Sequence, residues 1–75
     1  MRHKLVENAS GAEVKPGMRL IRDGQIYELV DFQVRQPPST GRVRVRNVET
    51  RAVHEYYPSV FDLRIEEVPH ERFGD

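Results

Sequence analysis

Residues 36–48 constrain the fold of this chain more than any other part of the sequence. Two prolines and a glycine come first, and arginine then alternates with valine from Arg42 onward. Proline has no N–H group to donate to a sheet ladder, so the double proline should interrupt strand pairing. Successive side chains of a strand point to opposite faces of the sheet. We therefore predict a strand with Val43 and Val45 in a core and an arginine face outside.

Short apolar runs separated by turn residues occupy most of the remaining sequence. Asp23-Gly24 is a strong signal for a two-residue hairpin. In the strand that follows, the alternation fails at Leu29-Val30, which predicts a β-bulge or burial on both faces. The expected extended segments are residues 5–6, 18–22, 25–34, 42–48, 52–57 and 63–68, with a turn or a single 3₁₀ turn over residues 58–62.

Five or six short strands in one small chain predict an all-β domain, folded as a small barrel with little or no helix. The 75 residues make one domain. We expect order over about residues 4–68 and a frayed tail over residues 69–75. The chain has no cysteine and therefore no disulfide or thiolate metal site.

No apolar run approaches the roughly 20 residues that cross a bilayer. The charged start, Met1 to Lys4, is not followed by the apolar stretch of a signal peptide. We therefore expect a cytoplasmic protein without membrane association, either a monomer or a weak homodimer.

The formal net charge is zero, but the charges are unevenly distributed. Residues 35–51 contain five arginines against Glu49, a local charge of +4, whereas residues 52–75 contain two arginines and six acidic residues, a local charge of −4. A neutral total argues against a protein that coats DNA. A local basic patch can still attract a polyanion, because screening removes the influence of remote charges beyond about 8–10 Å.

Three stretches resemble the N-terminal domain of elongation factor P and its initiation-factor relatives. They are Lys15-Pro16-Gly17-Met18, Asp23-Gly24-Gln25-Ile26-Tyr27-Glu28-Leu29-Val30 and Gly41-Arg42-Val43-Arg44-Val45-Arg46-Asn47. The similarity covers roughly residues 15–57 and implies an SH3-like, KOW-like barrel of five to six strands. That family carries a modified lysine, or an arginine, at the tip of the loop before the strand. The corresponding loop here, residues 37–41, contains no lysine.

A second resemblance covers most of the chain. Ser39-Thr40-Gly41-Arg42-Val43, followed by Tyr56-Tyr57-Pro58-Ser59-Val60-Phe61, is similar to a pattern in small uncharacterised phage, prophage and plasmid proteins. The early segment Gly11-Ala12-Glu13-Val14-Lys15-Pro16-Gly17 is similar to theirs as well. The resemblance implies an accessory protein of a mobile element, and it transfers no functional residue.

The first candidate site is the arginine face of the predicted strand. A tight turn between Val48 and Arg51 would place Val53, Glu55 and Tyr57 on this face, and His54 and Tyr56 beside the valines. We expect a nucleic acid, RNA or a single strand, as its ligand, with a tyrosine as a stacking platform. The predicted nucleic-acid contacts are Arg35, Arg42, Arg44, Arg46 and Tyr57. The alternative is a solvated face on which Glu55 pairs with an arginine, worth about 0–1 kcal/mol.

The second candidate site is a protein-interaction surface on the proline loop and the aromatic segment 56–61. Two prolines reduce the entropy lost when a loop docks on a partner. The predicted partner contacts are Pro37, Pro38, Ser39, Thr40 and Tyr57. Such a protein would act as an adaptor or as a modulator of a host protein. The alternatives are a stiff linker between two strands, and closure of one end of the core by Tyr56, Val60 and Phe61.

Neither a metal centre, a cofactor nor an active site is expected, so the predicted class is a non-enzymatic binding module. The histidines His3, His54 and His70 lack the spacing of zinc ligands. Asp62, Glu66 and Glu67 form an acidic cluster in the sequence. Glu66 and Glu67 would point to opposite faces of a strand, so we do not expect these carboxylates to share a metal ion. No serine lies in a nucleophile elbow or beside an evident base.

Overall fold

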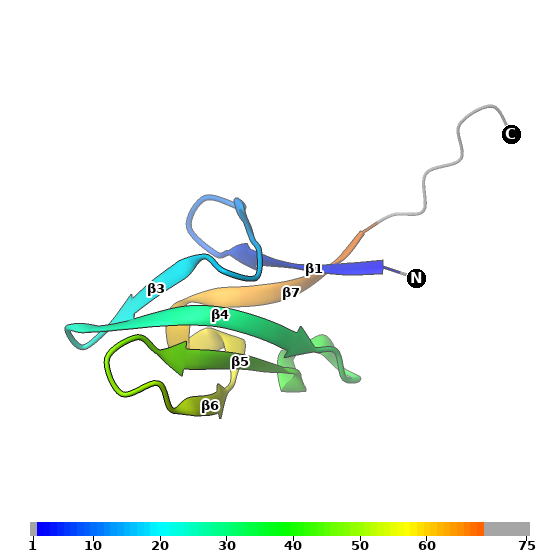
Figure 1. The fold of residues 1–75 in the computed structure, drawn as a ribbon. Coiled ribbons are helices and arrows are strands. Elements are labelled where there is room, and N and C mark those ends of the chain that lie inside the picture. Colours follow the sequence, from blue (N-terminus) through cyan, green and yellow to red (C-terminus); the bar gives the residue numbers. More distant parts are fainter. Residues whose placement is uncertain (1, 69–75) are drawn as a thin grey trace, which may run out of the picture.

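The computed structural model describes residues 2–68 and is built from short strands and two single-turn 3₁₀ helices (Figure 1). The strands are β1 (Arg2–Glu7), β2 (Glu13–Val14), β3 (Arg19–Arg22), β4 (Gln25–Gln33), β5 (Arg42–Asn47), β6 (Val53–Tyr56) and β7 (Leu63–Val68), and the 3₁₀ helices are η1 (Pro38–Thr40) and η2 (Pro58–Phe61). The predicted all-β class is confirmed. The expected tail, residues 69–75, and His70 lie outside the described residues.

The strands form two antiparallel sheets, ordered β2-β1-β7 and β3-β4-β5-β6. Residues 2–68 form seven strands rather than five or six, because the segment around Val14 pairs with β1 instead of staying in a turn. Within residues 2–68 no strand ladder joins the two sheets, so the expected barrel is not closed by strand pairing. Three of the edge strands are short, with two residues in β2 and four each in β3 and β6, which limits pairing between the sheets.

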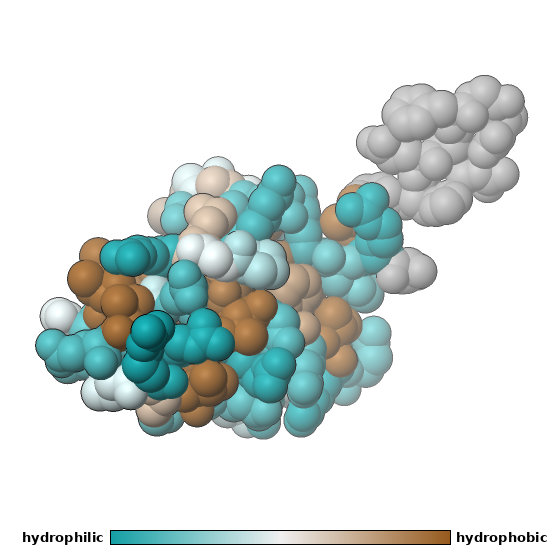
Figure 2. Space-filling view, in the orientation of Figure 1, coloured by the Kyte–Doolittle hydropathy of each residue, from teal (hydrophilic) through white to brown (hydrophobic). Residues whose placement is uncertain are grey.

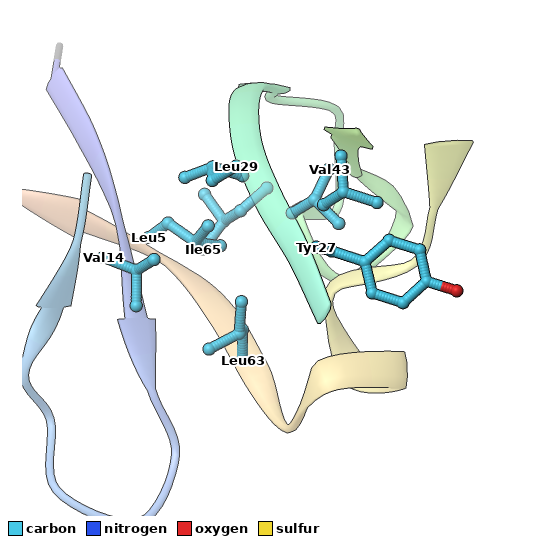
Figure 3. Packing of buried hydrophobic residues seen from close by; sticks show 8 residues of the cluster. Leu5, Val14, Tyr27, Leu29, Val43, Leu63 and Ile65 are labelled. Carbon is cyan, nitrogen blue, oxygen red and sulfur yellow. The ribbon is translucent and has the colours of Figure 1, made fainter. Parts of the chain in front are cut away.

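The core lies between the two sheets (Figure 3). Its buried members are Leu5, Val14, Tyr27, Leu29, Val43, Val45, Leu63 and Ile65. In β5 the valines are buried and the arginines are half-buried, which confirms the predicted inside and outside of this strand.

An aromatic cluster closes one end of the core. The ring of Tyr27 meets Phe61 edge-on at 5.5 Å and Tyr56 at 6.2 Å, and the last two rings lie 5.6 Å apart. Tyr56 and Phe61 are both partly buried against the core. These two aromatic side chains therefore belong to the core, as the alternative interpretation of segment 56–61 predicted.

The turn and bulge signals of the sequence are confirmed. Asp23 and Gly24 both have positive φ, 51° and 76°, and join Arg22 to its partner Gln25 in the two-residue hairpin. In the pairing of β4 with β5, Leu29 lies opposite Val45, but Asp31 lies opposite Arg44. Val30 is the extra residue of the bulge, and it shifts the following residues of β4 to the other face.

The hairpin between β5 and β6 has the predicted register. Arg44 pairs with Glu55 and Arg46 with Val53, whereas Val45 pairs with His54. A buried asparagine, Asn47, fixes this turn. Its side-chain oxygen accepts the backbone N–H groups of Glu49 and Thr50 at 2.9 and 3.0 Å, and its amide group donates to Gln25 Oε1 at 2.8 Å.

Candidate functional site

The arginine face, defined here as Arg42, Arg44, Arg46 and Tyr57, lies on the outer side of the four-stranded sheet. β5 contributes the three arginines at alternate positions, and Tyr57 follows the end of β6. Each arginine is half-buried, whereas Tyr57 is 48% exposed. The structure therefore brings together four of the five residues predicted to contact nucleic acid.

Two of these arginines are already paired with acidic residues of β4. Arg44 makes a bidentate contact with Asp31, with Nε–Oδ1 and Nη2–Oδ2 distances of 2.7 and 2.6 Å. Arg46 Nη1 lies 3.2 Å from Glu28 Oε1. The hydrogen bonds from Arg44 lower the pKa of Asp31 below its ordinary value, and the same contact raises the pKa of Arg44.

The sequence left open whether Glu55 pairs with an arginine, and Asp31 and Glu28 rather than Glu55 form the ion pairs with Arg44 and Arg46. The charge of Glu55 nevertheless contributes to the raised pKa of Arg44. Glu55 lies opposite Arg44, yet within residues 2–68 it forms no ion pair. Both partners come from the other neighbouring strand, β4. Glu28 lies opposite Arg46 before the bulge, and the bulge turns Asp31 outward beside Arg44. The alternation of β4 read together with the bulge signal at Leu29-Val30 could have identified this pairing.

Arg42 links the proline loop to the aromatic segment. Its guanidinium carbon lies 3.9 Å from the ring centroid of Tyr57, and Nη2 donates to the tyrosine hydroxyl at 3.2 Å. Nη1 donates to the backbone oxygens of Thr40 and Gly41. The arginine therefore holds the end of η1 against the residue that precedes η2.

Arg35, the fifth predicted nucleic-acid contact, lies after β4 and is exposed. Its Nη2 atom donates to Gln33 Oε1 at 3.3 Å, and Gln33 is the cross-strand partner of Arg42. Arg35 is thus tied to the Arg42 end of the face rather than aligned with the other arginines.

A groove of about 300 Å³ lies between the two 3₁₀ helices, and we call it the proline groove. Its lining consists of Pro38, Ser39, Pro58, Ser59, Leu63, Arg64 and Ile65. Leu63 and Ile65 are core residues, 3% and 7% exposed, whereas Ser39 and Ser59 are exposed. The groove therefore has an apolar base and a polar mouth.

The proline groove brings together the two segments expected to contact a protein partner. Of the predicted contacts, Pro38 and Ser39 line it, while Tyr57 lies just before the wall formed by Pro58. Pro37 is exposed outside this lining, and its backbone oxygen accepts the Thr40 hydroxyl at 2.7 Å. The β7 residues of the lining could not be predicted from the sequence, because their proximity to η1 arises only from packing of the two sheets.

Close packing at Gly41 fixes the wall of the groove. A Cβ atom at this position would lie 2.6 Å from both Gln33 O and Ile65 Cδ1. Only glycine allows η1 to lie so close to β4 and β7. Together with the contacts of Arg42, this approach makes the groove a preformed feature.

Comparison of the chain with protein-family models, with curated proteins and with solved structures gave no match. The two resemblances of the sequence therefore stay predictions. In residues 2–68 no three histidine, cysteine or acidic side chains gather in a way that could hold a metal ion. The same part of the chain contains no helix of the length and apolarity needed to span a membrane.

Proposed function

We propose that this protein is a non-enzymatic binding module that recognises another protein, and that the proline groove holds an apolar side chain of that partner. The observation that carries the proposal is the preformed groove between η1 and η2, with core side chains at its base. The module would serve as a cytoplasmic adaptor or host-protein modulator, in line with the mobile-element origin that the second resemblance implies.

The lining of the groove favours an apolar ligand group. Two proline rings, Leu63 and Ile65 supply its apolar surface. Arg64 also lines it, but its guanidinium group donates to Glu66 Oε2 at 2.9 Å and to Asn8 Oδ1 at 3.1 Å. The arginine therefore offers its aliphatic stem rather than an unpaired charge.

The surroundings of the groove are typical of a protein interface. Tyr57 and Arg42 lie beside it, and tyrosine and arginine are the residue types enriched where binding energy concentrates. Because the prolines and the Arg42 contacts already restrict both walls, little conformational entropy would be lost on binding.

A tryptophan at position 59 should fill the groove and abolish partner binding. The protein, its Ser59→Trp variant and a control, Lys15→Trp, would be used to capture proteins from nuclease-treated host lysate. Lys15 is exposed in the turn after β2 and does not line the groove. We expect specific partners to be retained by the wild type and the control, and to fall at least about tenfold with Ser59→Trp, the effect of losing one buried anchor side chain.

The melting midpoints of both variants must first match that of the wild type, which separates filling of the groove from unfolding. Retention of every captured protein by Ser59→Trp would contradict the proposal. So would the capture of proteins from untreated lysate but of none from nuclease-treated lysate.

A nucleic-acid ligand is the second candidate, favoured by the guanidinium of Arg42 stacked on the exposed ring of Tyr57. A phosphate backbone on this face would have to displace Asp31 from Arg44 and Glu28 from Arg46. This competition makes the face a weaker polyanion site than its local charge indicates.

The competition itself supplies a test. If single-stranded RNA binds the arginine face, Asp31→Asn should raise the affinity by freeing Arg44, and Arg44→Glu should abolish it. Fluorescence anisotropy with a labelled single-stranded RNA would measure both, and the affinity must fall as salt rises. Absence of binding at low salt would rule out this candidate.

A further inference from the structure

β3 is an edge strand with unused backbone groups. Arg22 and Gln25 flank the two-residue turn and form a hydrogen-bonded pair, after which bonded and non-bonded pairs alternate along the ladder. The bond from Leu29 N to Met18 O, 2.9 Å, agrees with this alternation. The N–H and C=O groups of Arg19 and Ile21 therefore point away from β4, and within residues 2–68 no other backbone group bonds to them.

A second groove of about 300 Å³ runs beside this free edge, and we call it the edge groove. Its lining consists of Glu7, Ala9, Arg19, Leu20, Ile21, Phe61, Asp62 and Leu63. It lies between β3 of one sheet and residues of β1, β7 and the η2 segment on the other side, where no strand pairing within residues 2–68 joins the sheets. Leu20, Phe61 and Leu63 give it an apolar floor, and Glu7 and Asp62 give it an acidic far wall.

An exposed apolar side chain marks the same edge. Ile21 is 73% exposed, the most of any large apolar residue among those described, and it lies opposite Ile26 in the hairpin. Figure 2 shows hydrophobic atoms gathered at the end of the molecule that holds the β3–β4 hairpin. Free hydrogen-bonding groups, a groove and an uncovered apolar side chain thus occur together.

We propose that β3 binds an extended segment of a partner protein as an additional antiparallel strand, with one of its side chains in the edge groove. Addition of a strand to a free sheet edge satisfies the backbone groups of both chains, and side-chain pockets supply the specificity. The site deepens the proposed function, since it also requires a protein ligand, but it shares only Leu63 with the proline groove.

A second copy of this chain does not fit the site. The far wall of the edge groove is formed by Glu7 at the end of β1 and by Asp62 directly after η2, so the protein's own chain already flanks the groove on the side opposite β3. β3 of another copy would bring its whole sheet, and its Leu20 already packs against its own core. A segment without neighbouring strands is the occupant that the groove admits.

The lining predicts the side chains of the segment. The residue opposite Leu20 would point into the edge groove and should be apolar. The residue opposite Ile21 should be apolar as well, to cover that side chain. The residue opposite Arg19 should be acidic, because Arg19 has no ion pair within residues 2–68 and its neighbour Glu28 is engaged by Arg46. From its N-terminus to its C-terminus, an antiparallel segment meets Ile21, Leu20 and Arg19 in that order. Its three residues should therefore be apolar, apolar and acidic.

The probe is the capped peptide Thr-Val-Leu-Glu-Thr, titrated to millimolar concentration into the ¹⁵N-labelled full chain. Hydrogen exchange of the Arg19 and Ile21 amides should slow by about tenfold or more on saturation, since each gains a hydrogen bond. The Leu20 amide, already directed at β4, should not change. Val53 and Glu55, whose backbone groups point outward from the β6 edge, serve as a control and should also stay unchanged.

N-methylated peptides test the geometry of the added strand. Methylation at the valine or glutamate nitrogen removes a donor to β3 and should weaken binding by about tenfold. Methylation at the leucine nitrogen, which points away from β3, should leave the affinity nearly unchanged. Equal effects at all three nitrogens, equal protection at the β6 edge, or no saturation at millimolar peptide would each overturn the proposal.

The Ser59→Trp variant separates this site from the proline groove. It should bind the peptide as the wild type does. If the peptide fails to bind while Ser59→Trp still loses its captured partners, only strand addition is wrong. If the peptide binds while Ser59→Trp keeps every partner, only the role of the proline groove is wrong.

Discussion

Leu29→Ala is expected to lower the free energy of unfolding by about 2–5 kcal/mol, because it removes buried apolar surface and leaves a cavity between the two sheets. Leu29 is 1% exposed and belongs to the buried cluster that lies between the two sheets. A domain of this size has only about 4–11 kcal/mol of total stability, at 0.05–0.15 kcal/mol per residue. The variant should therefore lose a large fraction of the total stability, as urea denaturation followed by circular dichroism would show.

Val34→Ala is a suitable control for this measurement. Val34 follows the end of β4 and is exposed, so its truncation should change the stability by no more than about 0.5 kcal/mol. A cost below about 1 kcal/mol for Leu29→Ala would show that the interior between the sheets is not closely packed.

Gly41→Ala is expected to cost about 1–3 kcal/mol through overpacking. The φ angle of Gly41 is −64°, which any residue adopts, so the penalty comes from space and not from backbone conformation. The new methyl group would meet Gln33 O and Ile65 Cδ1 at 2.6 Å, and the backbone oxygen cannot rotate away. η1 would have to move, and the wall of the proline groove would move with it.

A double-mutant cycle of Gly41→Ala with Ile65→Val isolates the contact between the new methyl group and Ile65 Cδ1. The valine lacks the Cδ1 atom, so Gly41→Ala should cost less in the Ile65→Val background than in the wild type. Gly24→Ala provides the comparison, because its added methyl meets nothing within 4 Å and its cost arises from a positive φ of 76°. The cost of Gly24→Ala should be the same in both backgrounds, and an equal cost of Gly41→Ala in both would contradict the clash with Ile65 Cδ1.

Local pattern was sufficient to predict most of the fold. Side chains alternate between the two faces of a strand, so a strand with one buried face has only two possible sets of buried residues. In β5 the alternation of arginine and valine identified the buried set. Asp23-Gly24 located the hairpin, and the break at Leu29-Val30 located the bulge. The local pattern did not contain how the two sheets meet. In the part of the chain that the structure describes, the barrel expected from the number of strands is not closed by strand pairing.

The candidate site was less predictable, because its properties depend on contacts between distant segments. The arginines were correctly placed on one face, but their charge balance depends on the neighbour in β4 as well as on the hairpin partner in β6. The edge groove depends on the outer edge of β3, which pairs with β4 on its inner side and with no strand of residues 2–68 on its outer side. The proline groove depends on contact of β7 with both 3₁₀ helices. No spacing within a single segment could indicate either groove.

The bulge in β4 has a consequence for the recognition of relatives. Val30 is the residue without a counterpart in β5, so a homologue that lacks it could keep Leu29 opposite Val45 and Asp31 opposite Arg44. An alignment of such a homologue would show a one-residue gap inside a strand, where gaps are usually taken as a sign of misalignment or divergence. At position 30 the same gap would indicate a shared architecture, with the core and the ion pair preserved on either side of it.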